Sequence, residues 1–270
     1  MIAVRIARIG KLLREVDNAS LLSPNTIHDL RIATREADAT LSVFQPLLKK
    51  KTFKRVRRVI KRIRQATGGL RDLDVLITRI THSRSKSPKL LKNLRMERTE
   101  IRHGIKNVLS TRYLQKKLMR WSRKGFRIHV DSELRFSDWA KQQLPRHVHD
   151  FLKIVSRQPT SPKELHQLRI AVKRLRYRLE ILAEAFSSGT FKTSTDALKL
   201  LQKHLGDIND FSVAIKRFRK MRRNGIKIPA GAIRHEKMKR RKATREFREI
   251  WSLESLTQML EMLEITATSA

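Results

Sequence analysis

Apolar residues recur along most of this chain at intervals of three and four positions, the spacing that places them on one face of an α-helix. Two pairs, Ser23-Pro24 and Ser161-Pro162, are typical of helix starts, because serine caps free backbone amides and proline fits the first helical turn. We therefore expect an all-α protein. The pattern predicts helices over about 2–17, 24–44, 47–67, 70–82, 88–109, 137–156, 162–186, 191–205, 209–223, 232–248 and 250–264.

Glycines and one irregular stretch separate these predicted helices. Gly68-Gly69, Gly206 and Gly225 are expected to break the pattern, because glycine is a weak helix former. The stretch 124–135 (KGFRIHVDSELR) is the least helical part of the chain and the expected junction between two halves. These halves are predicted to form separate helical bundles over residues 1–123 and 137–265.

The two halves repeat each other when the chain is shifted by 138 positions, the difference between His28 and His166. The same shift, without a gap, places Ser23-Pro24 on Ser161-Pro162. Well-separated blocks that match in one register point to an internal duplication. Further identical residues that coincide are Leu30 with Leu168, Arg31 with Arg169, Ala33 with Ala171, Gly68 with Gly206 and Asp72 with Asp210.

Each matching helix carries a stripe of histidine and basic residues on the side opposite its apolar residues. A basic stripe on one helix is usually a solvated surface, but this one recurs in both halves with histidine in the same place. Neighbouring like charges at this spacing repel each other, so we interpret the stripe as a face that holds an anion. It consists of His28, Arg31 and Arg35 in the first copy, and of His166, Arg169, Lys173 and Arg176 in the second.

The helix that follows the first stripe is more basic still. Residues 49–64 (KKKTFKRVRRVIKRIR) contain ten basic residues in sixteen and no acid. The basic runs at 216–223 and 237–242 are interpreted as solvated surface that steers anions. Cations that share one face of helix 49–64 are Lys54, Arg57, Arg58, Lys61 and Arg64, and the second copy offers Lys192, Lys199 and Lys203.

The net charge supports a polyanionic partner. Sixty-two Lys and Arg against 25 Asp and Glu leave +37, and a folded chain with this surplus repels itself unless anions gather on it. Absence of cysteine excludes disulfides and thiolate metal sites. No apolar run approaches the roughly 18 residues of a membrane span, and the first residues lack the apolar core of a signal peptide. We expect a cytoplasmic protein.

These motifs resemble those of the CHAD domain, the conserved histidine α-helical domain. The resemblance covers about residues 20–265 and rests on HDLRIATR at 28–35, GLRDLDV at 69–75, LHQLRIAVKRLRY at 165–177 and LGDIND at 205–210. It implies one CHAD domain over 1–270, built as two pseudo-symmetric four-helix-type bundles, and non-catalytic binding of inorganic polyphosphate. The basic residues of the family motifs correspond here to His28, Arg31, Arg35, His166, Arg169, Lys173, Arg174 and Arg176.

The first motif departs from the family pattern. Glu36 and Asp38 follow Arg35, where the family often continues with basic residues. These acids reduce the positive charge on this face of the first half and favour the second half as the main binding surface. We expect the two stripes to border a shared basic groove that holds polyphosphate, with helices 49–64 and 191–205 supplying further cations.

The acidic and histidine residues are not assigned to a metal or to catalysis. Asp72 and Asp74 lie about 200° apart around a helix, and with Asn209 and Asp210 they are expected to cap helices or orient His and Arg side chains. The sequence His147-Val148-His149-Asp150 suggests an HD-type hydrolase, but the further ligands such a site needs are not found at suitable spacing. We expect a surface cluster there, and no cofactor.

Two alternative functions stay open. Non-specific nucleic-acid binding would use the same charges, although aromatic residues make up only 6% and do not alternate with basic ones. A scaffold that coats polyphosphate granules or a membrane surface is the other. The chain contains no phosphate-binding loop, dinucleotide fingerprint or nucleophile elbow, so an enzyme is not predicted.

Overall fold

All regular structure in the described part of the chain is helical. The computed structural model describes residues 1–18, 23–81, 87–109, 112–126, 134–187, 189, 191–229, 231–252, 258 and 261. No β-strand occurs among these residues, so the prediction of an all-α protein is confirmed. The chain divides into two compact units, Met1–Val130 and Asp131–Ala270. Among the described helices, none is both long and apolar enough to cross a membrane.

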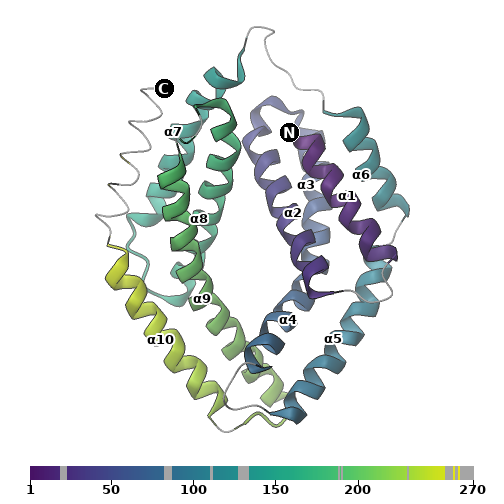
Figure 1. The fold of residues 1–270 in the computed structure, drawn as a ribbon, viewed down its shortest axis with the longest axis vertical. Helices are drawn as coiled ribbons and strands as arrows, with labels where there is room; N and C mark the ends of the chain where they lie inside the picture. Colours follow the sequence, from purple (N-terminus) through teal and green to yellow (C-terminus); the bar gives the residue numbers. More distant parts are fainter. Residues whose placement is uncertain are drawn as a thin grey trace. The chain divides into compact units, whose positions relative to one another are not determined.

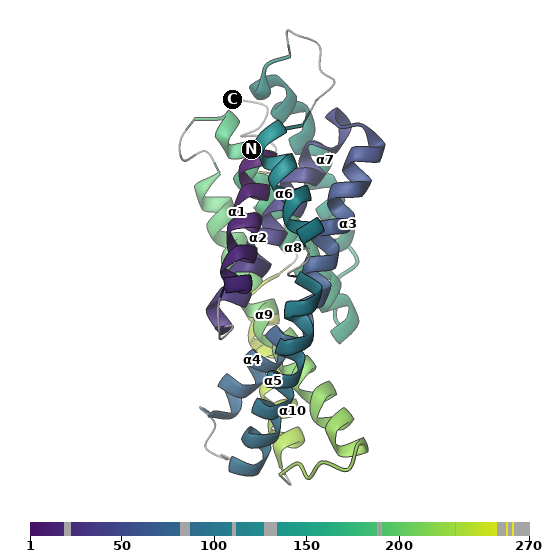
Figure 2. The same ribbon diagram turned by 90° about the vertical axis from the view of Figure 1, so that its right-hand side faces the viewer.

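The first unit is a set of helices arranged around α1 and α2. Ser23 caps α2 as predicted, because its Oγ accepts a hydrogen bond from the backbone N–H of Thr26 at 3.0 Å. α1 packs along α2 and α6, α2 packs on α3, and α4 packs on α5 (Figures 1 and 2). The elements are α1 (Ile2–Asn18), α2 (Pro24–Val43), a short 3-10 turn (Gln45–Leu47), α3 (Lys50–Ala66), α4 (Gly68–Thr81), α5 (Pro88–Leu109) and α6 (Arg112–Lys124).

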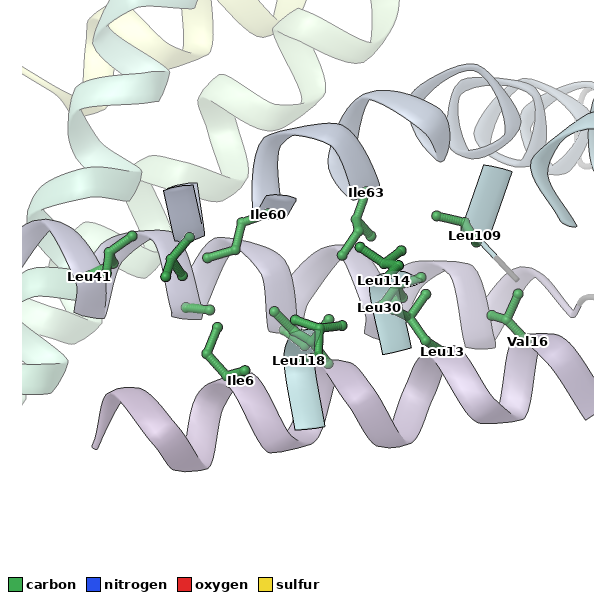
Figure 3. Packing of buried hydrophobic residues seen from close by; sticks show 14 of the residues in the cluster. Ile6, Leu13, Val16, Leu30, Leu41, Ile60, Ile63, Leu109, Leu114 and Leu118 are labelled. Carbon is green, nitrogen blue, oxygen red and sulfur yellow. The ribbon is translucent and has the colours of Figure 1, made fainter. Parts of the chain in front are cut away.

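The core of this unit forms where the apolar faces of α1, α2, α3, α5 and α6 meet. Figure 3 shows Leu13 of α1, Leu30 of α2 and Ile63 of α3 pointing toward one another, with side chains of α5 and α6 around them. Leu30 and Leu41 of α2 are completely buried. Because the leucine face of α2 is fixed in the core, the opposite face of the same helix is held toward solvent.

The described helices of the second unit are arranged around α8 and α9. α8 packs on α7 and α9, and α10 packs on α9 (Figure 1). α8 begins with a capping box, in which Ser161 Oγ accepts from the backbone N–H of Glu164 and the Glu164 carboxylate accepts from the backbone N–H of Ser161. The elements are α7 (Phe136–Val155), α8 (Pro162–Leu182), a 3-10 turn (Ala183–Ala185), α9 (Lys192–Arg223) and α10 (Ala232–Ile250).

The predicted break at Gly206 is wrong, because α9 runs through this residue without interruption. A helical glycine costs only about 1 kcal/mol relative to alanine, and burial of Leu201, Leu205 and Ile208 offsets that cost. The breaks at Gly68 and Gly225 are correct. α4 begins at Gly68 after Thr67 has ended α3, and Gly225 follows α9 with a φ of +77° that suits glycine.

Among the described helices, α6 is one that the sequence pattern did not predict. Its buried residues Leu114 and Leu118 pack against the core, but basic residues around them obscure the apolar period. The predicted helix over 250–264 lies largely outside the described residues, as does most of the junction at 124–135.

Candidate functional site

The predicted basic stripe of the first unit lies on α2, on the side away from the core. We call His28, Arg31 and Arg35 the α2 stripe, and all three are partly exposed. Burial lowers the pKa of His28, and the cations Arg71, Arg35 and Arg31 lower it further, while Asp29 offsets part of this effect. These surroundings therefore favour the neutral form of the His28 imidazole. An anion that neutralised those cations would favour its protonation.

Arg31 has a structural contact that the sequence pattern did not reveal. Its Nη1 donates to the backbone oxygen of Arg64 at 2.7 Å and to Thr67 Oγ1 at 3.2 Å. These hydrogen bonds satisfy the last turn of α3 and fix it to α2. Burial, followed by the charge of Arg35, lowers the pKa of Arg31 to about 10, which leaves the guanidinium protonated at neutral pH.

The two acids that depart from the family motif are both paired within the first unit. Arg5 and Arg8 of α1 contact the Glu36 carboxylate at 3.2 and 2.7 Å. Asp38 accepts a hydrogen bond from Arg64 at 2.9 Å and lies 3.3 Å from Nε of Arg57. Arg57 and Arg64, both predicted ligand residues, therefore already have a protein carboxylate beside them.

The remaining predicted cations of α3 are open to solvent. Lys54, Arg58 and Lys61 are exposed, and none of the three has an acidic partner among the described residues. Arg57 lies over the ring of Phe53, 5.6 Å from its centroid, which holds its side chain along the helix. Of the five predicted site residues of α3, three are thus cations without an acidic partner among the described residues and two share Asp38.

The histidine of the second unit is oriented by an amide. His166 is exposed at the start of α8, and its Nδ1 lies 2.7 Å from Oδ1 of Asn209 in α9. The amide orientation is fixed in turn, because Asn209 Nδ2 donates to Asp210 Oδ1 at 3.3 Å. An amide oxygen only accepts, so Nδ1 of His166 carries a proton and Nε2 is directed away from Asn209.

The basic residues that follow His166 extend along α8. We call His166, Arg169, Lys173, Arg174 and Arg176 the α8 stripe. Arg174 is exposed, and Arg169, Lys173 and Arg176 are partly exposed. Arg176 donates to Gln202 and to Glu180, and its guanidinium lies over the Tyr177 ring. On α9, Lys199 pairs with Asp196 at 2.8 Å and Lys203 is exposed.

Some positions that differ by 138 interact with partners that also differ by 138. His28 is influenced by Arg71 in the first unit, and His166 contacts Asn209 in the second. Asp38 pairs with Arg64, and the equivalent Arg176 donates to Gln202. The charge at these positions is reversed. Glu36 and Asp38 of the first unit correspond to Arg174 and Arg176 of the second.

The other predicted acids have local partners. Asp74 is buried and pairs with Arg98 of α5. The charge of Asp72 raises the pKa of Arg31 and so acts on the α2 stripe. Within the described residues no group of three or more His, Asp or Glu side chains is arranged to hold a metal ion.

His147 does not belong to a surface cluster, and that prediction is wrong for this residue. His147 is 9% exposed, and its Nε2 is buried without a hydrogen-bond partner among the described residues. Burial, followed by the charge of Arg178, lowers its pKa to about 4, although Asp150 acts in the opposite direction. The apolar face of α7 turns His147 inward, whereas His149 and Asp150 are exposed.

Comparisons with known proteins agree with this architecture. The model of the family described as CHAD domain matches residues 6–219. Among solved structures, the crystal structure of the CHAD domain from the plant Ricinus communis is similar, with a TM-score of 0.71 and 20% sequence identity. The alignment covers 97% of this chain and 89% of the plant chain, and at that identity it shows a common fold. No curated protein sequence matches this chain.

Proposed function

This chain belongs to the CHAD domain family, and from that premise we propose that it binds inorganic polyphosphate without catalysis, chiefly along the α8 stripe. The observation that carries the proposal is the arrangement of the α8 stripe itself. Arg169, Lys173 and Arg174 follow an exposed, oriented histidine within about two helical turns. A row of this kind matches a ligand that repeats a negative charge at short intervals.

Polyphosphate suits such a surface better than a ligand that carries bases or rings. Each phosphate offers oxygens that only accept hydrogen bonds at neutral pH, and guanidinium groups bind them in a forked geometry. A polyphosphate chain has no bases or rings that a protein could recognise. Recognition therefore reduces to the spacing and number of cations, which α8 and the exposed face of α3 supply.

The α8 stripe is the better candidate of the two because two acids follow the α2 stripe in the sequence and pair with neighbouring cations of the first unit. Glu36 and Asp38 occupy four arginines of the first unit, whereas the equivalent positions of the second unit are the cations Arg174 and Arg176. Of these, Arg174 is exposed. We assign the larger share of the binding energy to the second unit. The shared groove expected from the sequence stays a prediction.

His166 contributes as an imidazolium in this proposal. Since Nδ1 donates to Asn209, a phosphate oxygen can be bound only by a protonated Nε2. A protonated His166 should therefore bind polyphosphate more tightly than a neutral one.

The corresponding contacts in the two units also support the proposed internal duplication. The interacting pairs 28/71 and 166/209, and 38/64 and 176/202, are each related by the same shift of 138 positions. Ser23 and Ser161 both cap the helix that carries the stripe. A duplicated bundle whose copies later diverged in charge accounts for these contacts.

A competition titration at physiological salt tests the proposed ligand. Fluorescent long-chain polyphosphate is bound to the protein and challenged with DNA, RNA and short phosphates at matched charge concentration. We expect only long polyphosphate to compete well. Equal competition by DNA or RNA would contradict the proposal and favour general polyanion binding.

Substitutions in α8 test the position of the proposed polyphosphate site. Arg169→Ala combined with Lys173→Ala should weaken polyphosphate binding at least about tenfold, because two charge-assisted contacts are lost. It should also lower the slope of log affinity against log salt by about 1.4, at about 0.7 per phosphate contact. The matched control removes two exposed cations of α6, Lys116→Ala with Arg120→Ala, and should change affinity less than about twofold. Equal effects of both pairs would place the site elsewhere.

A further inference from the structure

A second cationic site lies within the second unit, at a cavity between α10 and the start of α8. The cavity has a volume of about 300 Å³. Pro162 and Leu165 of α8 and Ile208 of α9 form its apolar part. A volume of this size is at the lower end of the range for small-molecule sites.

The opposite wall of the cavity is formed by arginines of α10. Their spacing along the helix, at 240, 241, 245 and 248, places them on one face, with the hydroxyl-bearing Thr244 among them. Arg241, Arg245 and Arg248 are exposed, and Arg240 is half-buried. Four guanidinium groups and a hydroxyl thus line a cavity whose other side is apolar.

These arginines are not balanced by protein carboxylates. Arg240, Arg241 and Arg248 have no acidic partner among the described residues, and Arg245 has only Glu249, at 3.6 Å on the exposed side of the helix. Like charges three and four positions apart on a helix repel each other. A multivalent anion would remove that repulsion.

The nearest acid of α8 is already engaged. Glu164 Oε2 accepts hydrogen bonds from the backbone N–H groups of Thr160 and Ser161, at 3.0 and 2.9 Å. The same contacts satisfy the free amides at the start of α8. The helix terminus therefore contributes little to anion binding here, and the arginine side chains are the recognising groups.

We propose that this cavity binds a nucleoside polyphosphate. The arginines of α10 take the phosphates, and the apolar surface of Pro162, Leu165 and Ile208 takes the ring system. A bare phosphate chain has no use for an apolar wall. A nucleoside triphosphate carries both a charge near −4 and an apolar body, which are the two properties that the cavity combines.

The residues of this site are separate from those of the α8 stripe, although the two are neighbours in the chain. Leu165 precedes His166, and Ile208 precedes Asn209. Successive residues of a helix point about 100° apart, so the cavity and the His166–Asn209 pair occupy different faces of the same helix pair. Variants can therefore separate the two activities.

Isothermal titration calorimetry with ATP, at physiological salt and without magnesium, tests the proposal. The wild-type chain should bind one ATP per chain. Arg241→Gln with Arg248→Gln should lower ATP affinity at least about tenfold, since two charge-assisted contacts are lost. Lys239→Gln with Lys242→Gln removes the same charge from the opposite face of α10 and should change affinity less than about twofold.

Two further titrations complete the test. Tripolyphosphate should bind more weakly than ATP, because it lacks the ring, and tighter or equal binding would overturn the nucleotide assignment. Arg169→Ala with Lys173→Ala should keep ATP binding while it loses polyphosphate binding. If that pair lost ATP and Arg241→Gln with Arg248→Gln kept it, the cavity would not be the site. Far-UV circular dichroism verifies that each variant is folded.

Discussion

Asn209 fixes the ring of His166 through a 2.7 Å contact between its Oδ1 and the imidazole Nδ1. The contact joins α8 to α9 within the second unit and determines which ring nitrogen can meet a ligand. Since Asp210 accepts from the Asn209 amide nitrogen, the arrangement has a defined direction from acid to amide to imidazole. Nε2 can then donate to a phosphate oxygen only when the ring is doubly protonated.

Asn209→Leu should therefore weaken polyphosphate binding without removing any charge. We expect a loss of about threefold to tenfold, since one oriented charge-assisted hydrogen bond becomes disordered. The affinity should also depend less steeply on pH, because without the amide oxygen the neutral ring can carry its proton on Nε2 and donate to phosphate. Fluorescence titrations at several pH values measure both effects.

A double variant provides the control. His166→Ala should remove the same binding contribution, and adding Asn209→Leu to it should change the affinity little, because the two residues act as a unit. Additive losses would show that Asn209 acts on binding by another route.

The acids of the first unit should limit its affinity for polyphosphate. Asp38→Asn leaves Arg57 and Arg64 without their shared carboxylate, so more positive charge faces a ligand. We expect polyphosphate affinity to rise a few-fold at physiological salt. Glu246→Gln is the matched control, because it frees Lys242 of α10 and changes net charge equally. A similar rise in both variants would indicate a general charge effect.

The sequence was sufficient to predict most of the helices and the positions of both stripes. Leucine spacing in α2 and α8, together with the two Ser-Pro starts, determines which face of each helix is buried, and the structure follows that pattern. These features depend on local periodicity, which a single sequence carries.

Features that depend on packing between distant segments could not be predicted in this way. The chain passes through Gly206 as a helix because Leu201, Leu205 and Ile208 are buried, and nothing local indicates that burial. The hydrogen bonds of Arg31 to the end of α3 and the pairing of Asp38 with Arg64 join residues that are far apart in sequence. From periodicity alone, Arg31 and Arg64 were predicted only to bind a ligand, whereas both also make contacts that join helices of the first unit.

Arg31 and Arg35 should respond differently to substitution, although both belong to the α2 stripe. Arg31→Ala removes the 2.7 Å hydrogen bond to the Arg64 carbonyl and the one to the Thr67 hydroxyl, and we expect a loss of about 1–3 kcal/mol in the free energy of unfolding. Arg35→Ala removes a partly exposed cation from the same stripe and should change stability by less than about 0.5 kcal/mol. Urea unfolding followed by circular dichroism measures both. Equal stability of the two variants would contradict the structural role of Arg31.

His147 should make the stability of the second unit depend on pH. Its pKa is about 4 in the folded chain, against the ordinary value of 6.5. Between these values the unfolded chain binds the proton and the folded chain does not, so acid favours unfolding. The stabilising effect is complete above about pH 6.5 and is lost as the pH falls toward 4. A shift of this size corresponds to an upper limit of about 3 kcal/mol, at about 1.4 kcal/mol per pH unit.

His147→Gln removes the titrating group and keeps a polar side chain of similar length. Urea midpoints of the wild type should fall between pH 6.5 and 4.5, and those of the variant should fall less. His149→Gln is the matched control, because His149 lies two positions after His147 in α7 and is exposed. Its variant should keep the wild-type pH profile. An unchanged slope in His147→Gln would mean that the acid sensitivity of the chain originates from other groups.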